Sequence, residues 1–280
     1  MFAALKKISG TPSFHRKFIE AKRLWYRDRG EPIQYGEHKL RYLPGTRPVR
    51  LRYIDSPDVT VRNDVRQINF FLDHARSGDS VLDVGGHFGQ YAVLFAALVS
   101  DSGRVISFEP DPAARNILFQ NLELNGFANR VEIESLALFD KKGEHSFFSK
   151  GADSMSSLFR SGLGANASAA DVVEYRVETA CLDDYLDSRD LAPPDFVKLD
   201  TEGAEINILR GARKLLQSEA IIVCELHPYA WEEFGSSFDE LLLLIRDAGS
   251  DSLQRLLAKR SLLQSCSAIV LVVSSAAILA

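Results

Sequence analysis

The sequence predicts an α/β fold in which helices cover both faces of a doubly wound, mostly parallel sheet. Short apolar segments alternate with longer helical patterns from about residue 63 to residue 249, as in βαβ units. Five of the apolar segments end in glycines or acids, within the runs DVGG, FEPD, LALFD, KLDTEG and ELHP. Such sheets bind ligands at the carboxyl ends of their strands, near the point where the strand order reverses. The recurring polar exits therefore predict a ligand site along one edge of the sheet.

The elements follow one another in a regular order. After a helix expected at about residues 13–29, the next is a helix expected over 63–76, with Gly78 after its end as a stop signal. The later strands are expected at 80–86, 104–110, 131–138, 195–200 and 220–227. The helices between and after them are expected at 90–99, 112–126, 203–216 and 237–249.

Residues 140–180 interrupt this alternation. The segments 145–150 and 174–182 have strand-like patterns, and the chain between them is rich in Ser, Gly and Ala. A long loop of this kind is either mobile or covers a ligand. We therefore expect a flexible loop over 149–170 above the site.

The two ends of the chain differ from its body. Residues 1–60 are expected to form a basic N-terminal cap and residues 61–280 the main domain, because residues 1–52 hold 13 Lys and Arg against 4 Asp and Glu. The basic residues are scattered, which favours a solvated helix or cap over a surface for nucleic acid or anionic lipid. Residues 268–280 are apolar, but as a helix they would cover about 20 Å of a hydrocarbon core about 30 Å thick. The β propensity of Ile269–Val273 instead predicts a last strand of the sheet.

The composition is that of an ordinary globular protein, with 46% hydrophobic and 25% charged residues. No apolar run reaches the roughly 18 to 20 residues of a transmembrane helix, and the N-terminus lacks the apolar core of a secretory signal. Cys181, Cys224 and Cys266 are odd in number and widely spaced, unlike a disulfide framework or a metal-ligand pattern. We expect a cytoplasmic protein with reduced thiols.

A glycine-rich turn is expected over 83–89, DVGGHFG, between a strand and a helix. Such a turn lets the backbone approach a ligand closely, with the first N–H groups of the helix directed at it. A dinucleotide site would use G-x-G-x-x-G, and the third glycine of that pattern is absent here. Asp83 before the glycines suits a ligand with an ammonium group better than one with phosphates.

Glu109 ends the next strand, in FEPD. A carboxylate at this place can accept hydrogen bonds from the two hydroxyls of a ribose, as acids do in nucleoside-binding α/β folds. The alternative is a surface acid at a strand end. Because Asp83 lies one strand earlier, we favour the ribose role.

These motifs, taken together, resemble those of the FkbM-type methyltransferase family. DVGGHFG resembles the D-V-G-A-N-x-G loop of that family, and RVISFEPDP resembles G-x-V-x-A-F-E-P-D-P. The later matches are NLELNG, LALFD, SMSSL, VETACLDDYL, VKLDTEGAE and CELHP, so that the resemblance covers roughly residues 63–245. Two departures are clear. Gly86 and His87 replace Ala-Asn in the first loop, and the sequence after Gly249 does not follow the ending of the family.

The resemblance implies a Rossmann-like class I methyltransferase that binds S-adenosylmethionine. It implies that Asp83, Gly85 and Gly89 hold the methionine end of the cofactor, that Glu109 holds the ribose, and that the segment from Asp200 to Gly203 faces the transferable methyl group. The remaining residues of the implied cofactor site are Gly86, His87, Pro110, Asp111, Leu136 and Ala137.

An alcohol that accepts a methyl group must lose its proton, so a general base is expected within hydrogen-bond reach. The candidates are strand-exit residues, namely Asp200, Glu202, Glu225 and His227. His227 is best suited near neutrality if its pKa stays near 6.5, although it could also simply cap its loop. Glu205 is as easily a helix cap or an ion-pair partner as a catalytic group, and Lys198 shares the strand parity of Asp200.

The sequence thus predicts an O-methyltransferase acting on a hydroxyl of a sugar, natural product or other small molecule, with no nucleic-acid partner. A nicotinamide-dependent oxidoreductase is one alternative, disfavoured by the glycine pattern and by Asp83. A non-catalytic scaffold with the same fold is another. No metal is predicted, although Asp200, Glu225 and His227 could form an oxygen and nitrogen ligand set.

Overall fold

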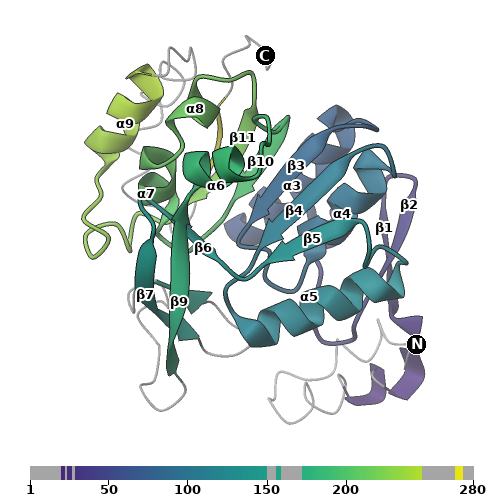
Figure 1. Cartoon of the computed structure of the whole chain (residues 1–280). Helices are drawn as coiled ribbons and strands as arrows, with labels where there is room; N and C mark the ends of the chain where they lie inside the picture. Colours follow the sequence, from purple (N-terminus) through teal and green to yellow (C-terminus); the bar gives the residue numbers. More distant parts are fainter. Residues whose placement is uncertain are drawn as a thin grey trace.

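A computed structural model describes residues 20–22, 24–26, 29–149, 156–158, 172–247 and 269–273 of the chain (Figure 1). Its central sheet has six strands. Their spatial order is β12 (Ile269–Val273), β11 (Ile221–Leu226), β10 (Phe196–Leu199), β3 (Ser80–Val84), β4 (Arg104–Phe108) and β5 (Val131–Glu134). All neighbours are parallel except β12, which runs antiparallel to β11. The strand order reverses between β3 and β10, which confirms the predicted doubly wound sheet.

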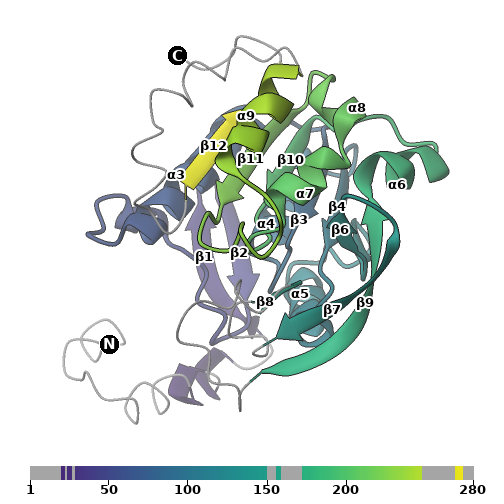
Figure 2. The ribbon, with the colours of Figure 1, turned by 90° about the vertical axis from the view of Figure 1, so that its left-hand side faces the viewer.

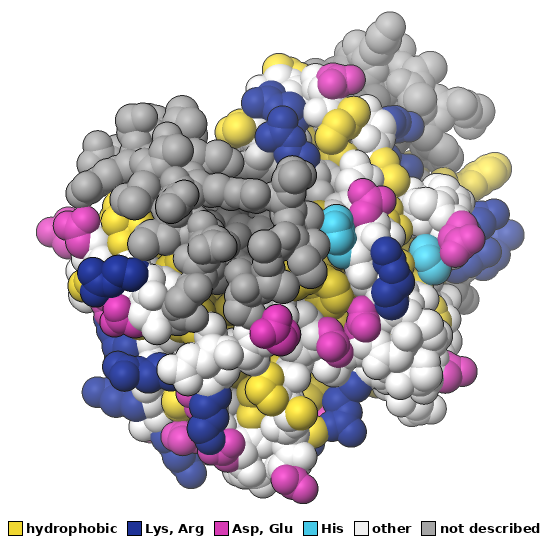
Figure 3. Space-filling model, turned by 90° about the horizontal axis from the view of Figure 1, so that it is seen from above, with side chains coloured by type: hydrophobic (Ala, Val, Ile, Leu, Met, Phe, Trp, Pro, Cys, Tyr) yellow, Lys and Arg dark blue, Asp and Glu magenta, His cyan; other side chains and the backbone are white. Residues whose placement is uncertain are grey.

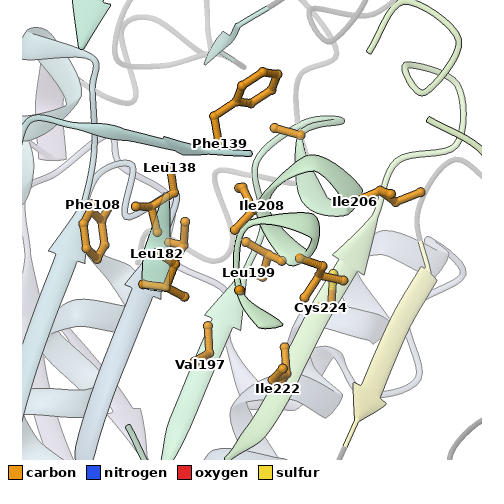
Figure 4. Close-up of a cluster of buried hydrophobic side chains, with 14 of the residues drawn as sticks. Phe108, Leu138, Phe139, Leu182, Val197, Leu199, Ile206, Ile208, Ile222 and Cys224 are labelled. Atoms are coloured by element: carbon orange, nitrogen blue, oxygen red, sulfur yellow. The ribbon is translucent and has the colours of Figure 1, made fainter. Parts of the chain in front are cut away.

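Helices cover both faces of this sheet, so its strands are buried apolar runs. One face carries α3 (Val59–His74), α4 (Gln90–Val99) and α5 (Pro112–Leu124). The other carries α6 (Leu182–Ser188), α7 (Glu205–Arg210), α8 (Arg213–Leu216) and α9 (Phe238–Asp247). Successive side chains of a strand point to opposite faces, so Val197 and Ile222 join the second core, which Figure 4 shows.

A smaller sheet stands beside the carboxyl ends of the main strands. Its order is β6 (Ala137–Phe139), β9 (Val173–Cys181), β7 (Gly143–Ser149) and β8 (Ser156–Ser157). The strand expected over 131–138 is therefore wrong as a single element, because β5 lies in the main sheet and β6 pairs with β9. The strand-like patterns at 145–150 and 174–182 are confirmed as β7 and β9. Of the loop expected over 149–170, all but Ser149 and residues 156–158 lie outside the described residues.

Two expected helices differ from the structure. α3 begins four residues before the expected start, because the side chain of Asp58 accepts a hydrogen bond from the N–H of Thr60 and caps the helix there. The helix expected over 203–216 is split into α7 and α8 at Gly211. A Cβ at Gly211 would lie 2.8 Å from the carbonyl oxygen of Phe139, so the break lets the chain pass close to β6.

The described part of the N-terminal region has helical residues at 20–22 and 24–26 and a hairpin packed on the main domain. Its strands are β1 (Glu31–Tyr35) and β2 (His38–Tyr42), followed by the 3-10 helix η2 (Leu51–Tyr53). The hydroxyl of Tyr42 donates to the carbonyl of Gln90, and Asn125 exchanges hydrogen bonds with the backbone of Arg41. A boundary at residue 60 stays a prediction.

The surface and the C-terminal strand are further features of the described structure. Acidic and basic side chains are mixed over the described part of the face seen from above (Figure 3). Within the described chain, no helix combines the length and apolarity needed to cross a bilayer. The predicted last strand is confirmed, since β12 pairs with β11 from Leu226↔Ile269 to Ile222↔Val273 (Figure 2). Residues 268 and 274–280 lie outside the described part.

Deleting β12 tests its role. Truncation after Ser265 exposes the edge of β11, and an uncovered strand edge favours association between chains. We expect the truncated chain to aggregate, or to melt at least about 5 °C below the full chain, in a thermal scan monitored by light scattering. A truncated chain of equal stability and solubility would show that β12 is an appendage.

Candidate functional site

A cavity of about 290 Å³ opens at the carboxyl ends of β3, β4 and β10, where the strand order reverses. Glu109 and Leu136 line its end beyond β4 and β5, and Asp200 and Glu202 line its end beyond β10. The complete lining is Val84, Gly85, His87, Phe108, Glu109, Pro110, Leu136, Ala137, Leu138, Phe147, Ser156, Leu158, Asp200, Thr201, Glu202 and Ala204. The cavity thus joins most of the predicted cofactor residues to two of the predicted catalytic ones.

The glycine turn after β3 forms one wall. Gly85 has φ +83°, and a Cβ on it would lie 1.8 Å from the carbonyl oxygen of Asp200. Only glycine allows this approach, so the turn after β3 and the turn after β10 are in backbone contact. His87 follows with φ +48° and lines the cavity.

Glu109 holds this turn to the next one. Its Oε2 accepts a hydrogen bond from the N–H of His87 at 2.7 Å, and its Oε1 accepts one from the N–H of Asp111, also at 2.7 Å. Burial raises the pKa of Glu109 to about 7, although these N–H groups lower it. Each carboxylate oxygen can accept a second hydrogen bond. Glu109 can therefore bind two hydroxyl groups without losing its backbone partners.

Four of the predicted cofactor residues lie behind the cavity wall rather than in it. Asp83 points to the α3 and α4 face, where its Oδ2 accepts from the hydroxyl of Ser107 at 3.2 Å and its Oδ1 lies 3.9 Å from Nζ of Lys198. Asp111 caps α5 by accepting from the N–H of Ala113. Gly86 and Gly89 are also absent from the lining. The predicted contact of these four residues with a cofactor stays a prediction, and their visible role is to support the turns.

The opposite end of the cavity is organised by Glu205, the first residue of α7. This carboxylate is fully buried. Its Oε1 accepts from the N–H of Gly203 at 2.8 Å and lies 3.0 Å from Nδ1 of His227. The N–H and hydroxyl of Thr201 also donate to it, both at 3.3 Å. Glu205 therefore fixes both the turn after β10 and the ring of His227.

His227 faces two acids with its other nitrogen. Its Nε2 lies 3.6 Å from Oε2 of Glu202 and 3.8 Å from Oδ1 of Asp200. Burial alone would lower the pKa of His227, but the charges of Glu205, Glu202 and Asp200 raise it to about 10. The imidazole is therefore protonated at neutral pH, in contrast to the expectation of a pKa near 6.5.

The two acids of this end differ in their partners. Burial raises the pKa of Glu202 to about 7, and the hydroxyl of Tyr229 donates to its Oε2 at 2.5 Å. Asp200 accepts from Nζ of Lys198 at 3.1 Å. Burial alone would raise the pKa of Asp200, but Lys198 and His227 hold it below its usual value.

Glu225 is separated from the other candidate bases. It points to the face covered by α3, where its Oε2 accepts from Nε2 of Gln67 at 3.0 Å. The ligand set considered from the sequence, which included Glu225, is therefore not assembled. The groups that come within 4.8 Å of one another are Asp200, Glu202 and His227, an arrangement that could also hold a metal ion.

Several contributors were not identified from the sequence. Tyr229 bonds Glu202, and Phe147 and Leu158 line the cavity from β7 and from the residue after β8. Tyr229 lies two residues after His227, so its place beside the site was within reach of sequence reasoning. Phe147 and Leu158 come from residues 140–180, which interrupt the alternation of strands and helices. In that part of the sequence no periodicity indicates which side chains face the main sheet.

Comparison with known proteins agrees with the family resemblance seen in the sequence. The family model described as the methyltransferase FkbM domain matches residues 83–252. The hexuronic acid methyltransferase AglP of Haloferax volcanii is 26% identical over 169 residues, which are 60% of this chain and 64% of that protein. The 2-O-methyltransferase NoeI of Sinorhizobium fredii is 25% identical over 154 residues, or 52% and 62% of the two chains. The chain thus spans less than two thirds of the length of either relative.

A solved structure of a methyltransferase FkbM from Methylobacillus flagellatus is also similar. It aligns with 67% of this chain and 48% of its own, at 16% identity and a TM-score of 0.37.

The charge on His227 can be measured by NMR titration of its ring. The pKa is raised, so the proton is held as pH rises past 6.5 and is lost only near 10. We expect the wild-type ring to stay protonated at pH 8, and Glu205→Gln to shift its titration towards neutrality. Glu232→Gln, an exposed acid five residues away, is the control. A wild-type ring that titrates near 6.5 would contradict the assigned electrostatics.

Proposed function

This chain belongs to the family of methyltransferases with an FkbM domain, and we propose that it transfers the methyl group of S-adenosylmethionine to a hydroxyl group of a saccharide. Family membership carries the reaction class, because the family model matches more than half of the chain. It sets aside the nicotinamide-dependent alternative. The two relatives, a hexuronic acid methyltransferase and a 2-O-methyltransferase, support the saccharide acceptor.

Different residues of the cavity suit different parts of the cofactor. Glu109, with two oxygens able to accept further hydrogen bonds, suits the vicinal hydroxyls of the ribose. Leu136 and Leu138 provide apolar surface beside it for the adenine ring. The methionine part then extends along Gly85, and the sulfonium is directed towards Asp200 and Glu202. The negative charges of this end suit a positively charged sulfur.

Methyl transfer requires alignment and the removal of one proton. The acceptor oxygen forms a bond to the methyl carbon while the carbon–sulfur bond breaks. The electron pair of the carbon–sulfur bond returns to the sulfur. Holding the two reactants in line can contribute about 7 to 11 kcal/mol. The proton of the hydroxyl must pass to a base within hydrogen-bond reach.

We assign the role of the general base that accepts this proton to Glu202 rather than to His227. A ring with a pKa of about 10 already carries a proton on Nε2 at neutral pH. Asp200 is held in ion pairs with a lowered pKa, which makes it a weak base. Glu202 has a pKa of about 7, close to the value that serves a general base best near neutrality. His227 then orients Glu202 and balances its charge.

Binding of the cofactor tests the first half of this proposal. Glu109→Ala removes a charged hydrogen-bond acceptor, and we expect calorimetry to show affinity for S-adenosylmethionine weakened by about 1.5 to 3 kcal/mol. Glu123→Ala, an exposed acid on α5, is the matched control. Equal affinity in Glu109→Ala and wild type would remove the assigned ribose site.

Turnover tests the second half. Glu202→Gln should lower turnover roughly 10²- to 10⁴-fold while the affinity for the cofactor changes little. Wild-type turnover should fall as pH drops through about 7, because Glu202 is then protonated. Glu225→Gln, which lies off the cavity wall, should change turnover less than about tenfold.

Three other results would contradict the assignment. Turnover in Glu202→Gln within threefold of wild type would move the base elsewhere. Activity that is lost on chelation and restored by a divalent cation would assign a metal ion to the same group. A wild-type chain that binds the cofactor but methylates no saccharide would favour the scaffold alternative.

A further inference from the structure

Strand β8 and the residue after it connect the two ends of the cavity. The hydroxyl of Ser156 donates to Oδ2 of Asp111 at 3.1 Å, next to the cofactor end. The hydroxyl of Ser157 donates to the main-chain carbonyl of Glu202 at 3.1 Å, at the catalytic end. Leu158 is buried and lines the cavity between them. Three consecutive residues therefore contact both sides of the site.

The geometry of a strand explains how so short a segment does this. Successive side chains of a strand point to opposite faces. Ser156 and Leu158 both face the cavity, whereas Ser157 does not line it and is 1% exposed. Pairing of β8 with β7, through Phe148↔Ser157, sets the orientation of the segment.

The backbone of Glu202 needs such a contact. Its φ is +54°, a left-handed conformation that costs a residue with a Cβ roughly 1 to 2 kcal/mol. Such a conformation persists only where the surroundings fix it. After Glu202, the N–H of Gly203 donates to Glu205. The carbonyl of Glu202 itself accepts the hydrogen bond of Ser157.

Ser156, the first residue of β8, donates to an ionised acid, Asp111. Burial alone would raise the pKa of Asp111, but hydrogen bonds from Ser149, from Ser156 and from the start of α5 hold it below its usual value. The N–H of Asp111 in turn donates to Glu109. Ser156 thus ties β8 to the residue that we assign to the ribose.

We propose that Ser157 is a positioning residue, which fixes the left-handed backbone of Glu202 so that its carboxylate faces the acceptor, and that Ser156 anchors Ser157 by its bond to Asp111. The proposal rests on the proposed function, because it gives Ser157 a role through the assigned base. Ser157 itself does not line the cavity. Its removal should therefore affect turnover and not cofactor binding.

The test compares Ser157→Ala with Ser157→Thr, which keeps the hydroxyl. Ser218→Ala is the matched control, because the hydroxyl of Ser218 also donates to a main-chain carbonyl, that of Leu215 at 2.7 Å, far from the cavity. For each chain, kcat, the Kd for S-adenosylmethionine, the pH–rate profile and hydrogen exchange of the amides of residues 201–205 are measured.

We expect Ser157→Ala to lower kcat at least tenfold, since a misplaced group can cost up to about 10²-fold, with Kd within twofold of wild type. Its acid limb in the pH–rate profile should move, and amides 201–205 should exchange faster. Ser157→Thr should recover most of the wild-type kcat and most of the wild-type protection of amides 201–205. Ser218→Ala should match wild type in all of these measurements.

Two outcomes would overturn the proposal. One is a Ser157→Ala chain with wild-type kcat and unchanged exchange at 201–205. The other is a loss of cofactor affinity as large as the loss of kcat, which would indicate a general structural role. Hydrogen exchange needs no turnover, so a failure of the proposed methyl transfer would be recognised separately from a failure of the positioning role.

Discussion

The buried carboxylate of Glu205 is the interaction on which the catalytic end depends. Removing a carboxylate from water costs several kcal/mol unless charges and hydrogen bonds offset that cost. Here the offset comes from the N–H groups of Gly203 and Thr201, from the ring of His227, and from Nε1 of Trp231 at 3.4 Å. One acid thereby shapes the turn after β10, sets which nitrogen of His227 faces Glu202 and Asp200, and holds the charge on that ring. The turn that carries Glu202 and the charged ring that faces its carboxylate therefore both depend on Glu205.

The strand order supplies the second constraint. Because β3 and β10 are neighbours, the turns that follow them meet, and the contact of Gly85 with the carbonyl of Asp200 joins the cofactor end to the catalytic end. Alternation along the strands separates the charged side chains into two sets. Asp83, Glu225 and Lys198 face α3 and α4, where they form a buried polar layer. The acids beyond the strand ends reach the cavity instead.

Much of this could be predicted from the sequence, and the failures have physical causes. Periodicity and polar strand exits indicate the sheet, the helices and the edge that binds ligands, since these depend on neighbours in sequence. Strand parity could also have placed Glu225 on the same face as Val223 and away from the cavity. The charge on His227 could not be inferred in this way, because the acid that contributes most to it is Glu205, 22 residues earlier. The hydrogen bond from Ser157 to Glu202 joins residues 45 positions apart, so a local sequence pattern cannot predict it either.

The most direct measurement compares methyl transfer by the wild-type chain and by Glu205→Gln. Each is incubated with isotopically labelled S-adenosylmethionine and a saccharide extract, the labelled product is identified by mass spectrometry, and calorimetry gives the cofactor affinity. We expect a saccharide O-methyl ether from the wild type. From Glu205→Gln we expect at least about a hundredfold less product, with affinity within about threefold of wild type. Wild-type rates in Glu205→Gln, or a label found on no hydroxyl group, would contradict the role of Glu205 or the proposed reaction.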